Sequence, residues 1–111
     1  MMSTHPPDLE VKLQRFNSDG LLYIELGKGS YAFLKFKVKG SVLVVESVYT
    51  PEEFRGRGIA TRLMDLIVEY AVSNGYKIDP RCSFAKHYFE KHSEKRATCL
   101  EPLEDLSSPP Q

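Results

Sequence analysis

A short turn rich in glycine and arginine is the segment whose residue types could do chemistry. Residues 55–60 read Arg-Gly-Arg-Gly-Ile-Ala and lead directly into a sequence with helical spacing. The first N–H groups of a helix have no internal acceptor, and the helix dipole places a partial positive charge there. Gly56 and Gly58 would leave those groups accessible, while Arg55 and Arg57 would add forked cationic donors. The turn is therefore predicted to bind a phosphate or pyrophosphate group.

Other phosphate-binding motifs do not fit this turn. A dinucleotide fingerprint needs Gly-x-Gly-x-x-Gly with a later acidic residue, and a P-loop needs Gly-Lys-Ser/Thr. Neither pattern occurs in the chain. RNA-binding Arg-Gly segments are repetitive, whereas this one begins a well-patterned helix. A plain polar loop stays open as an alternative, because turns with two glycines are common.

The apolar pattern predicts four strands before the turn. They are expected at residues 10–16, 21–26, 31–38 and 42–49. The last of them is apolar on both faces for most of its length, which is typical of a central strand. A helix follows from residue 58 to the stop signal Asn74-Gly75, then a short strand at 76–79. A second helix is predicted from Ser83, as its N-cap, to about His92.

This order of elements predicts an α+β fold in a single domain. The sheet is expected to be mixed, with antiparallel N-terminal strands followed by a β-α-β-α unit. Because a helix connects the strand at 42–49 to the strand at 76–79, these two strands should be parallel. The domain is expected to span residues 10–98, between flexible tails at 1–9 and 99–111 that are polar or rich in proline.

Composition excludes several classes of protein. The 111 residues include 15 basic and 15 acidic side chains, so the positive excess typical of nucleic-acid binding is missing. No apolar run approaches the roughly 20 residues that span a membrane, and no signal peptide is recognisable. We therefore expect a cytoplasmic protein without nucleic-acid or membrane partners, as a monomer or weak dimer. Cys82 and Cys99 are expected to be free thiols, with a bridge between them as the alternative.

The turn also carries a resemblance to a known family. Arg55-x-x-Gly58-x-Ala60 resembles the Arg/Gln-x-x-Gly-x-Gly/Ala signature of the GNAT superfamily of N-acetyltransferases. From about residue 10 to 92 the chain is similar to the small YjdJ-type branch of predicted acetyltransferases, which also has a later Pro-x-Cys, here Pro80 to Cys82. The resemblance implies a minimal GNAT fold, acetyl-coenzyme A as cofactor, and an acetyl acceptor that is an amine of a protein, peptide or small molecule.

The resemblance further implies where the cofactor would bind. Its pyrophosphate is expected at the main-chain amides of the turn, and its pantetheine arm beside the backbone of the central strand, with a β-bulge near Tyr49. The thioester is expected in a gap between the strands at 42–49 and 76–78. The candidates for cofactor binding are Val48, Tyr49, Arg55, Gly56, Arg57, Gly58, Ile59, Ala60, Thr61, Ser83 and Lys86.

Two residues are candidates for the chemical step. Glu46 is the one carboxylate in its apolar run and could act as a general base, directly or through water, or could be structural. Cys82 stands where helix N–H groups could lower the pKa of a thiol. The resemblance suggests that it faces the acetyl group, as a nucleophile or as part of the wall. Where larger relatives have an acidic tyrosine, Phe89 stands here, and neighbouring Tyr88 could simply pack in the core.

The sequence leaves three functions in competition. The first is an acetyl-coenzyme A-dependent N-acetyltransferase, and the second is a coenzyme-A-binding module with little or no transferase activity. The third and weakest is a nucleotide- or RNA-binding domain. No metal site is predicted, because Cys82, His87, His92 and Cys99 match no standard zinc spacing.

Overall fold

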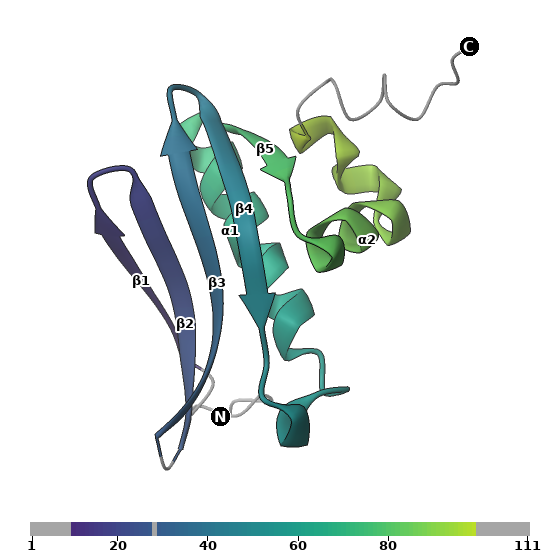
Figure 1. Cartoon of the computed structure of the whole chain (residues 1–111). Helices are drawn as coiled ribbons and strands as arrows, with labels where there is room; N and C mark the ends of the chain where they lie inside the picture. The colour runs from purple at the N-terminus through teal and green to yellow at the C-terminus, as the bar shows by residue number, and fades with distance from the viewer. Residues whose placement is uncertain (1–9, 28, 100–111) are drawn as a thin grey trace, which may run out of the picture.

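Five strands form one mixed sheet in the computed structural model of the chain, which describes residues 10–27 and 29–99 (Figure 1). The strands lie side by side in chain order. They are β1 (Val11–Phe16), β2 (Asp19–Gly27), β3 (Ser30–Lys39), β4 (Val42–Tyr49) and β5 (Lys77–Pro80). The first four pair antiparallel, and β5 joins β4 in parallel. The predicted α+β class, the internal position of β4 and the parallel pair are confirmed.

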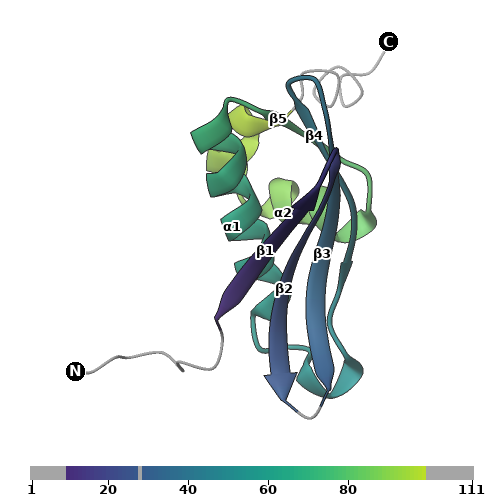
Figure 2. The same ribbon diagram turned by 90° about the vertical axis from the view of Figure 1, so that its left-hand side faces the viewer.

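The longest helix forms where the helical spacing predicts it. This helix, α1 (Ile59–Asn74), buries Ile59, Leu63, Ile67 and Ala71, four residues that recur every fourth position on one face. It ends at Gly75, whose φ of 75° is favourable for glycine. α1 packs across one face of the sheet (Figure 2), and a continuous core lies between them.

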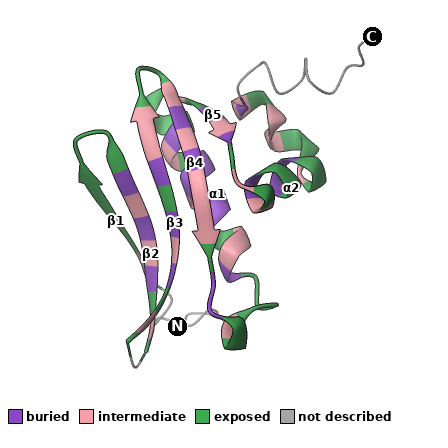
Figure 3. Cartoon of the chain, in the orientation of Figure 1, coloured by how far each residue is buried: buried purple, intermediate pink, exposed green. Residues whose placement is uncertain are grey.

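The alternation along β2 and β3 decides which residues reach that core. Figure 3 shows buried residues interspersed with half-buried and exposed ones along these strands. The buried members of the two strands include Leu22, Ile24, Ala32, Leu34 and Phe36. Residues between them, such as Lys35, belong to the opposite face of the sheet.

A second helix, α2 (Ser83–Lys91), lies beside the half of β4 that β5 does not reach (Figure 1). Its N-cap is Cys82, whose Sγ accepts a hydrogen bond of 3.4 Å from the Ala85 N–H. The expectation that Ser83 caps this helix is wrong, because Ser83 is already its first helical residue. The described residues also include two 3₁₀ helices, η1 (Glu52–Phe54) and η2 (Ser93–Thr98).

The β-bulge lies earlier in β4 than predicted. Pairing between β3 and β4 shifts so that Lys35 faces Ser47 while Phe36 faces Val45, which leaves Glu46 as the extra residue. The bulge therefore falls at Glu46 and not near Tyr49, which pairs regularly with Phe33.

The structure describes only a small part of the two predicted tails. The predicted tail at 1–9, and residues 100–111 of the predicted C-terminal tail, lie outside the described residues. Cys99, assigned to that tail, is buried and forms an isolated parallel bridge with Ile78 of β5. No disulfide joins Cys82 to Cys99, both of which lie within the described residues.

Candidate functional site

The N-terminal end of α1 presents main-chain amides that have no hydrogen-bond partners among the described residues. The first helical hydrogen bond runs from the Arg62 N–H to the Gly58 carbonyl, at 3.0 Å. The N–H groups of Ile59, Ala60 and Thr61 therefore precede the helical ladder, and no side chain caps this end of the helix. Gly58 is the N-cap with φ of 79°, a left-handed conformation in which other residues are strained.

These residues open on a cavity of about 420 Å³ between the end of β4, the turn and the start of α2. Its lining combines apolar side chains such as Val48, the cationic Arg55, and the glycines Gly56 and Gly58. Eight of the cofactor-binding candidates line it: Val48, Tyr49, Arg55, Gly56, Gly58, Ile59, Ala60 and Thr61. The head of α1 thus lines a cavity, and no side chain in the described part of the chain caps its amides.

Two arginines of the turn have different environments. Arg55 lines the cavity, and its Nε donates a hydrogen bond of 2.8 Å to the Thr50 carbonyl, which fixes the orientation of the guanidinium group. Arg57 instead places its Cζ 5.2 Å from the centroid of the Phe54 ring and does not line the cavity. Ser83 and Lys86, the candidates on α2, are exposed and also lie outside the cavity wall.

Three residues that line the cavity were missed by the sequence analysis, namely Thr50, Phe54 and Phe84. Thr50 is only 8% exposed, and its Oγ1 has no hydrogen-bond partner among the described residues. A buried hydroxyl without a partner costs about 1–3 kcal/mol, so such groups are uncommon. The available signal was strand alternation, which puts residues 48 and 50 on the same face.

The gap beside β4 opens beyond its last pair with β5. The two strands pair only from Val42 with Lys77 to Val45 with Pro80. One further bond, from the Arg81 N–H to the Val45 carbonyl, closes the ladder at 3.0 Å. Past this point the edge of β4 has no strand partner, and the chain turns through half-buried Cys82 into α2.

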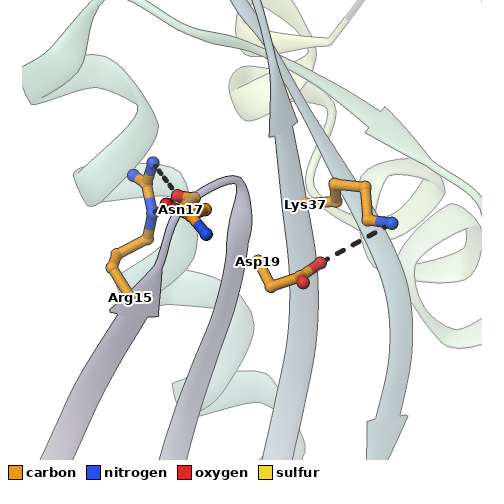
Figure 4. Close-up of polar contacts among 4 residues, drawn as sticks. All are labelled: Arg15, Asn17, Asp19 and Lys37. Carbon is orange, nitrogen blue, oxygen red and sulfur yellow. Dashed lines mark hydrogen bonds and ion pairs between the residues drawn. The ribbon is translucent and has the colours of Figure 1, made fainter.

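Glu46 faces away from the cavity. It is half-buried and borders a shallow hollow on the other face of the sheet, together with Lys35 and Lys37. Lys37 reaches Asp19 on β2, with its Nζ 3.6 Å from Oδ1, and Arg15 contacts the Asn17 carbonyl in the adjoining turn (Figure 4). Glu46 and the cavity at the head of α1 therefore lie on opposite faces of the sheet.

Tyr88 packs in the core. Its side chain is 2% exposed, its hydroxyl donates a 2.6 Å hydrogen bond to Asp65 Oδ1 of α1, and His92 stacks on its ring. Burial, followed by the hydrogen bond to Asp65, raises the pKa of the Tyr88 phenol above its usual value. Phe89 is buried as well. Neither aromatic residue lines the cavity.

Comparisons with known proteins agree with this architecture. A family model described as GCN5-related N-acetyl-transferase matches residues 22–98, which is more than half of the chain. The fold and the cavity together define a class of small α+β domains in which a turn with glycines precedes a helix that lines the site. The chain belongs to the GCN5-related N-acetyltransferase (GNAT) family.

One solved structure is similar over nearly the whole length. It is an NMR solution structure, from Staphylococcus aureus, described as a "GCN5-like putative N-acetyltransferase". It matches with a TM-score of 0.67 and 29% sequence identity, over 86% of this chain and 91% of that chain. No curated protein matches the chain. Within residues 10–27 and 29–99, no helix is both long and apolar enough to cross a bilayer.

Proposed function

We propose that this GNAT-family chain binds acetyl-coenzyme A and transfers the acetyl group to an amine. The observation that carries the proposal is the head of α1, where Ile59, Ala60 and Thr61 line a cavity and their amides have no acceptors among the described residues. Amides at a helix N-terminus bind a diphosphate well, because the hydrogen bonds and the helix dipole act together. Arg55 lines the same cavity and would add a forked cationic donor.

The unpaired edge of β4 fits the other half of the same ligand. Beyond Val45, no strand of the described chain pairs with β4 on the side from which β5 diverges. Val48 and Tyr49 lie in that segment and line the cavity. An extended arm with amide groups, such as pantetheine, could add there as a strand would. The cofactor supplies an activated acyl thioester when bound, and the residues of this chain would hold it at one end and orient it at the other.

The acetyl acceptor must lose a proton during the transfer. Glu46 remains our candidate base, and its place on the other face means that the amine would have to approach through the gap beside β4. Cys82 stands at the end of that gap and is the candidate for a covalent route. In that route the Cys82 thiol would lose its proton and its sulfur would take the acetyl group from the thioester, which releases coenzyme A as the free thiol. The amine would then attack the acetyl group on Cys82, lose a proton, and return the Cys82 sulfur to its thiol form.

A coenzyme-A-binding module with little transferase activity is the second candidate. One observation favours it: the hydroxyl of Tyr88 is buried and bonded to Asp65, so it is not available to protonate a leaving thiolate. Phe89 offers no acidic group. The two candidates share the cofactor and differ in turnover.

Two measurements test the proposal. Calorimetry with coenzyme A should show saturable binding, and absence of binding at millimolar ligand would exclude both candidates. Labelled acetyl-coenzyme A should then be screened against protein, peptide and polyamine acceptors. Transfer above the uncatalysed rate supports the enzyme, whereas binding without transfer supports the module. Acetyl on the intact protein, missing in Cys82→Ala, would support the covalent route.

A further inference from the structure

Thr50 has a buried hydroxyl that no described residue hydrogen-bonds. It follows β4 directly, is 8% exposed, and its Oγ1 makes no hydrogen bond to any described residue. A threonine hydroxyl has one donor and two acceptor positions, and buried polar groups are normally paired. The residue lines the cavity at the head of α1. Oγ1 itself is enclosed in the ligand-free protein, so the side chain would have to rotate about χ1 to turn its hydroxyl into the cavity, where a ligand would supply the missing partner.

The neighbouring residues fix Thr50 in this wall. Tyr49 turns to the other face of the sheet, where its ring packs 5.4 Å from that of Phe33. Val48, which pairs with buried Leu34, belongs to the helix-side face and lines the same cavity as Thr50. The carbonyl of Thr50 accepts the Arg55 Nε at 2.8 Å, which ties this backbone to the turn. The backbone of Thr50 thus has a defined place in the cavity wall, while its hydroxyl is held by no described residue.

The position of Thr50 along the chain suggests which part of a ligand it meets. It stands after Val48 and Tyr49, beside which an amide-bearing arm would extend, and before the turn that would hold a diphosphate. A hydroxyl at this junction lies next to the end of the arm that joins the diphosphate. Pantetheine carries a hydroxyl and amide groups, any of which can pair with a threonine side chain.

We propose that Thr50 Oγ1 hydrogen-bonds the pantetheine arm of coenzyme A and thereby distinguishes coenzyme A from nucleotides that carry only the diphosphate. This inference rests on the proposed function, because it presumes the same ligand in the same cavity. It assigns to Thr50 a positioning and specificity role and no part in proton transfer.

The test compares Thr50→Val, which keeps the shape and removes the hydroxyl, with Thr50→Ser, which keeps the hydroxyl. Coenzyme A and ADP are titrated by calorimetry into each full-length protein, ADP being a diphosphate without the arm. We expect Thr50→Val to weaken coenzyme A binding about tenfold, which is the loss of one hydrogen bond, and to leave ADP binding within about twofold. Thr50→Ser should bind coenzyme A nearly as wild type does.

Thermal unfolding of the ligand-free proteins separates this role from a structural one. Since the hydroxyl has no partner within residues 10–27 and 29–99, Thr50→Val should melt no lower than wild type. A lower melting temperature with unchanged coenzyme A affinity would overturn the inference. If Thr50→Val did not fold, the comparison of Thr50→Ala with Thr50→Ser would supply the same contrast.

The remaining outcomes are also decisive. An equal loss of affinity for coenzyme A and ADP in Thr50→Val would place the hydroxyl at the diphosphate. That result would contradict a hydrogen bond from Thr50 to the pantetheine arm. Failure of the wild-type protein to bind either ligand would remove the proposed function together with the inference. Binding of coenzyme A by wild type and Thr50→Val with equal affinity would remove the inference alone.

Discussion

At the level of single residues, the turn before α1 depends on backbone conformation more than on side-chain chemistry. Gly56 and Gly58 have φ of 83° and 79°, and a Cβ placed on either would meet no atom within 4 Å. Their requirement for glycine is therefore conformational in the ligand-free protein. Open space above them is also what a bound diphosphate would need, so one residue type meets both demands.

Gly58→Ala tests these two demands separately when it is compared with Gly75→Ala. Gly75, at the other end of α1, has a similar φ of 75° and equally open surroundings. Each substitution should lower the free energy of unfolding by about 1–2 kcal/mol, the cost of a left-handed alanine. Only Gly58→Ala should also weaken coenzyme A binding, by about tenfold. Denaturant unfolding and calorimetry measure the two effects, and equal affinity in both variants would exclude the turn from the binding site.

Arg55 and Arg57 offer a second matched pair. Lysine keeps the charge of either residue and removes the planar fork. Arg55→Lys should weaken coenzyme A binding about tenfold, because it loses both the bond to the Thr50 carbonyl and the forked donors in the cavity. Arg57→Lys should change the affinity less than about threefold, since that side chain packs on Phe54 outside the wall. The reverse order of effects in calorimetry would contradict the geometry.

At the level of elements, a hydrogen bond between α1 and α2 holds the wall of the cavity in place. Tyr88 of α2 bonds to Asp65 of α1, and Lys95 of η2 approaches the same carboxylate, with its Nζ 3.9 Å from Oδ1. Phe84, at the start of α2, lines the cavity. Tyr88 thus contributes to the site by holding α2 in place.

The pH dependence of stability tests this hydrogen bond. Because the pKa of Tyr88 is raised in the folded protein, its stabilising effect is complete below the unfolded value of about 10 and declines as the pH rises above it. Tyr88→Phe should cost about 1 kcal/mol at neutral pH, and the difference from wild type should shrink above about pH 10. Chemical denaturation of both proteins at neutral pH and above about pH 10 measures this difference in the free energy of unfolding. A difference that does not change with pH would mean that the phenol is not bonded as described.

The sequence predicted the elements well because each has a strong local signal. Residues 59, 63, 67 and 71 define the buried face of α1, and glycine at 75 ends the helix. The position of Glu46 was beyond such reasoning. Strict alternation would put residues 46 and 48 on one face, but the bulge at Glu46 inserts a residue, so Val48 faces the helices while Glu46 faces the other way. A bulge depends on pairing with β3, which no local pattern of β4 reveals.

For Thr50, in contrast to Glu46, the sequence does predict the face of the sheet on which the residue lies. Its position on the same face as Val48 was readable from alternation alone, since no bulge lies between them. That its hydroxyl lacks a partner was not readable, because this depends on every side chain around it. The N-cap of α2 was likewise misplaced by one residue, since serine is a more common cap than cysteine.

For the whole molecule, the sheet separates two surfaces. The cavity lies on the side of the helices, and the hollow beside Glu46 and Lys35 lies on the other face. The end of β4 beyond Val45 is where these two sides meet, since β5 no longer pairs there. A cofactor held on one side and an amine approaching from the other would meet at this gap. This arrangement is our proposal for how so short a domain combines the two substrates.

The most direct test of the central claim is an NMR titration of the labelled protein with coenzyme A. The account predicts that the largest amide shifts occur at Gly58, Ile59, Ala60 and Thr61, with little change at Gly75. Shifts concentrated around Lys35 and Glu46, or no shift at millimolar coenzyme A, would contradict it.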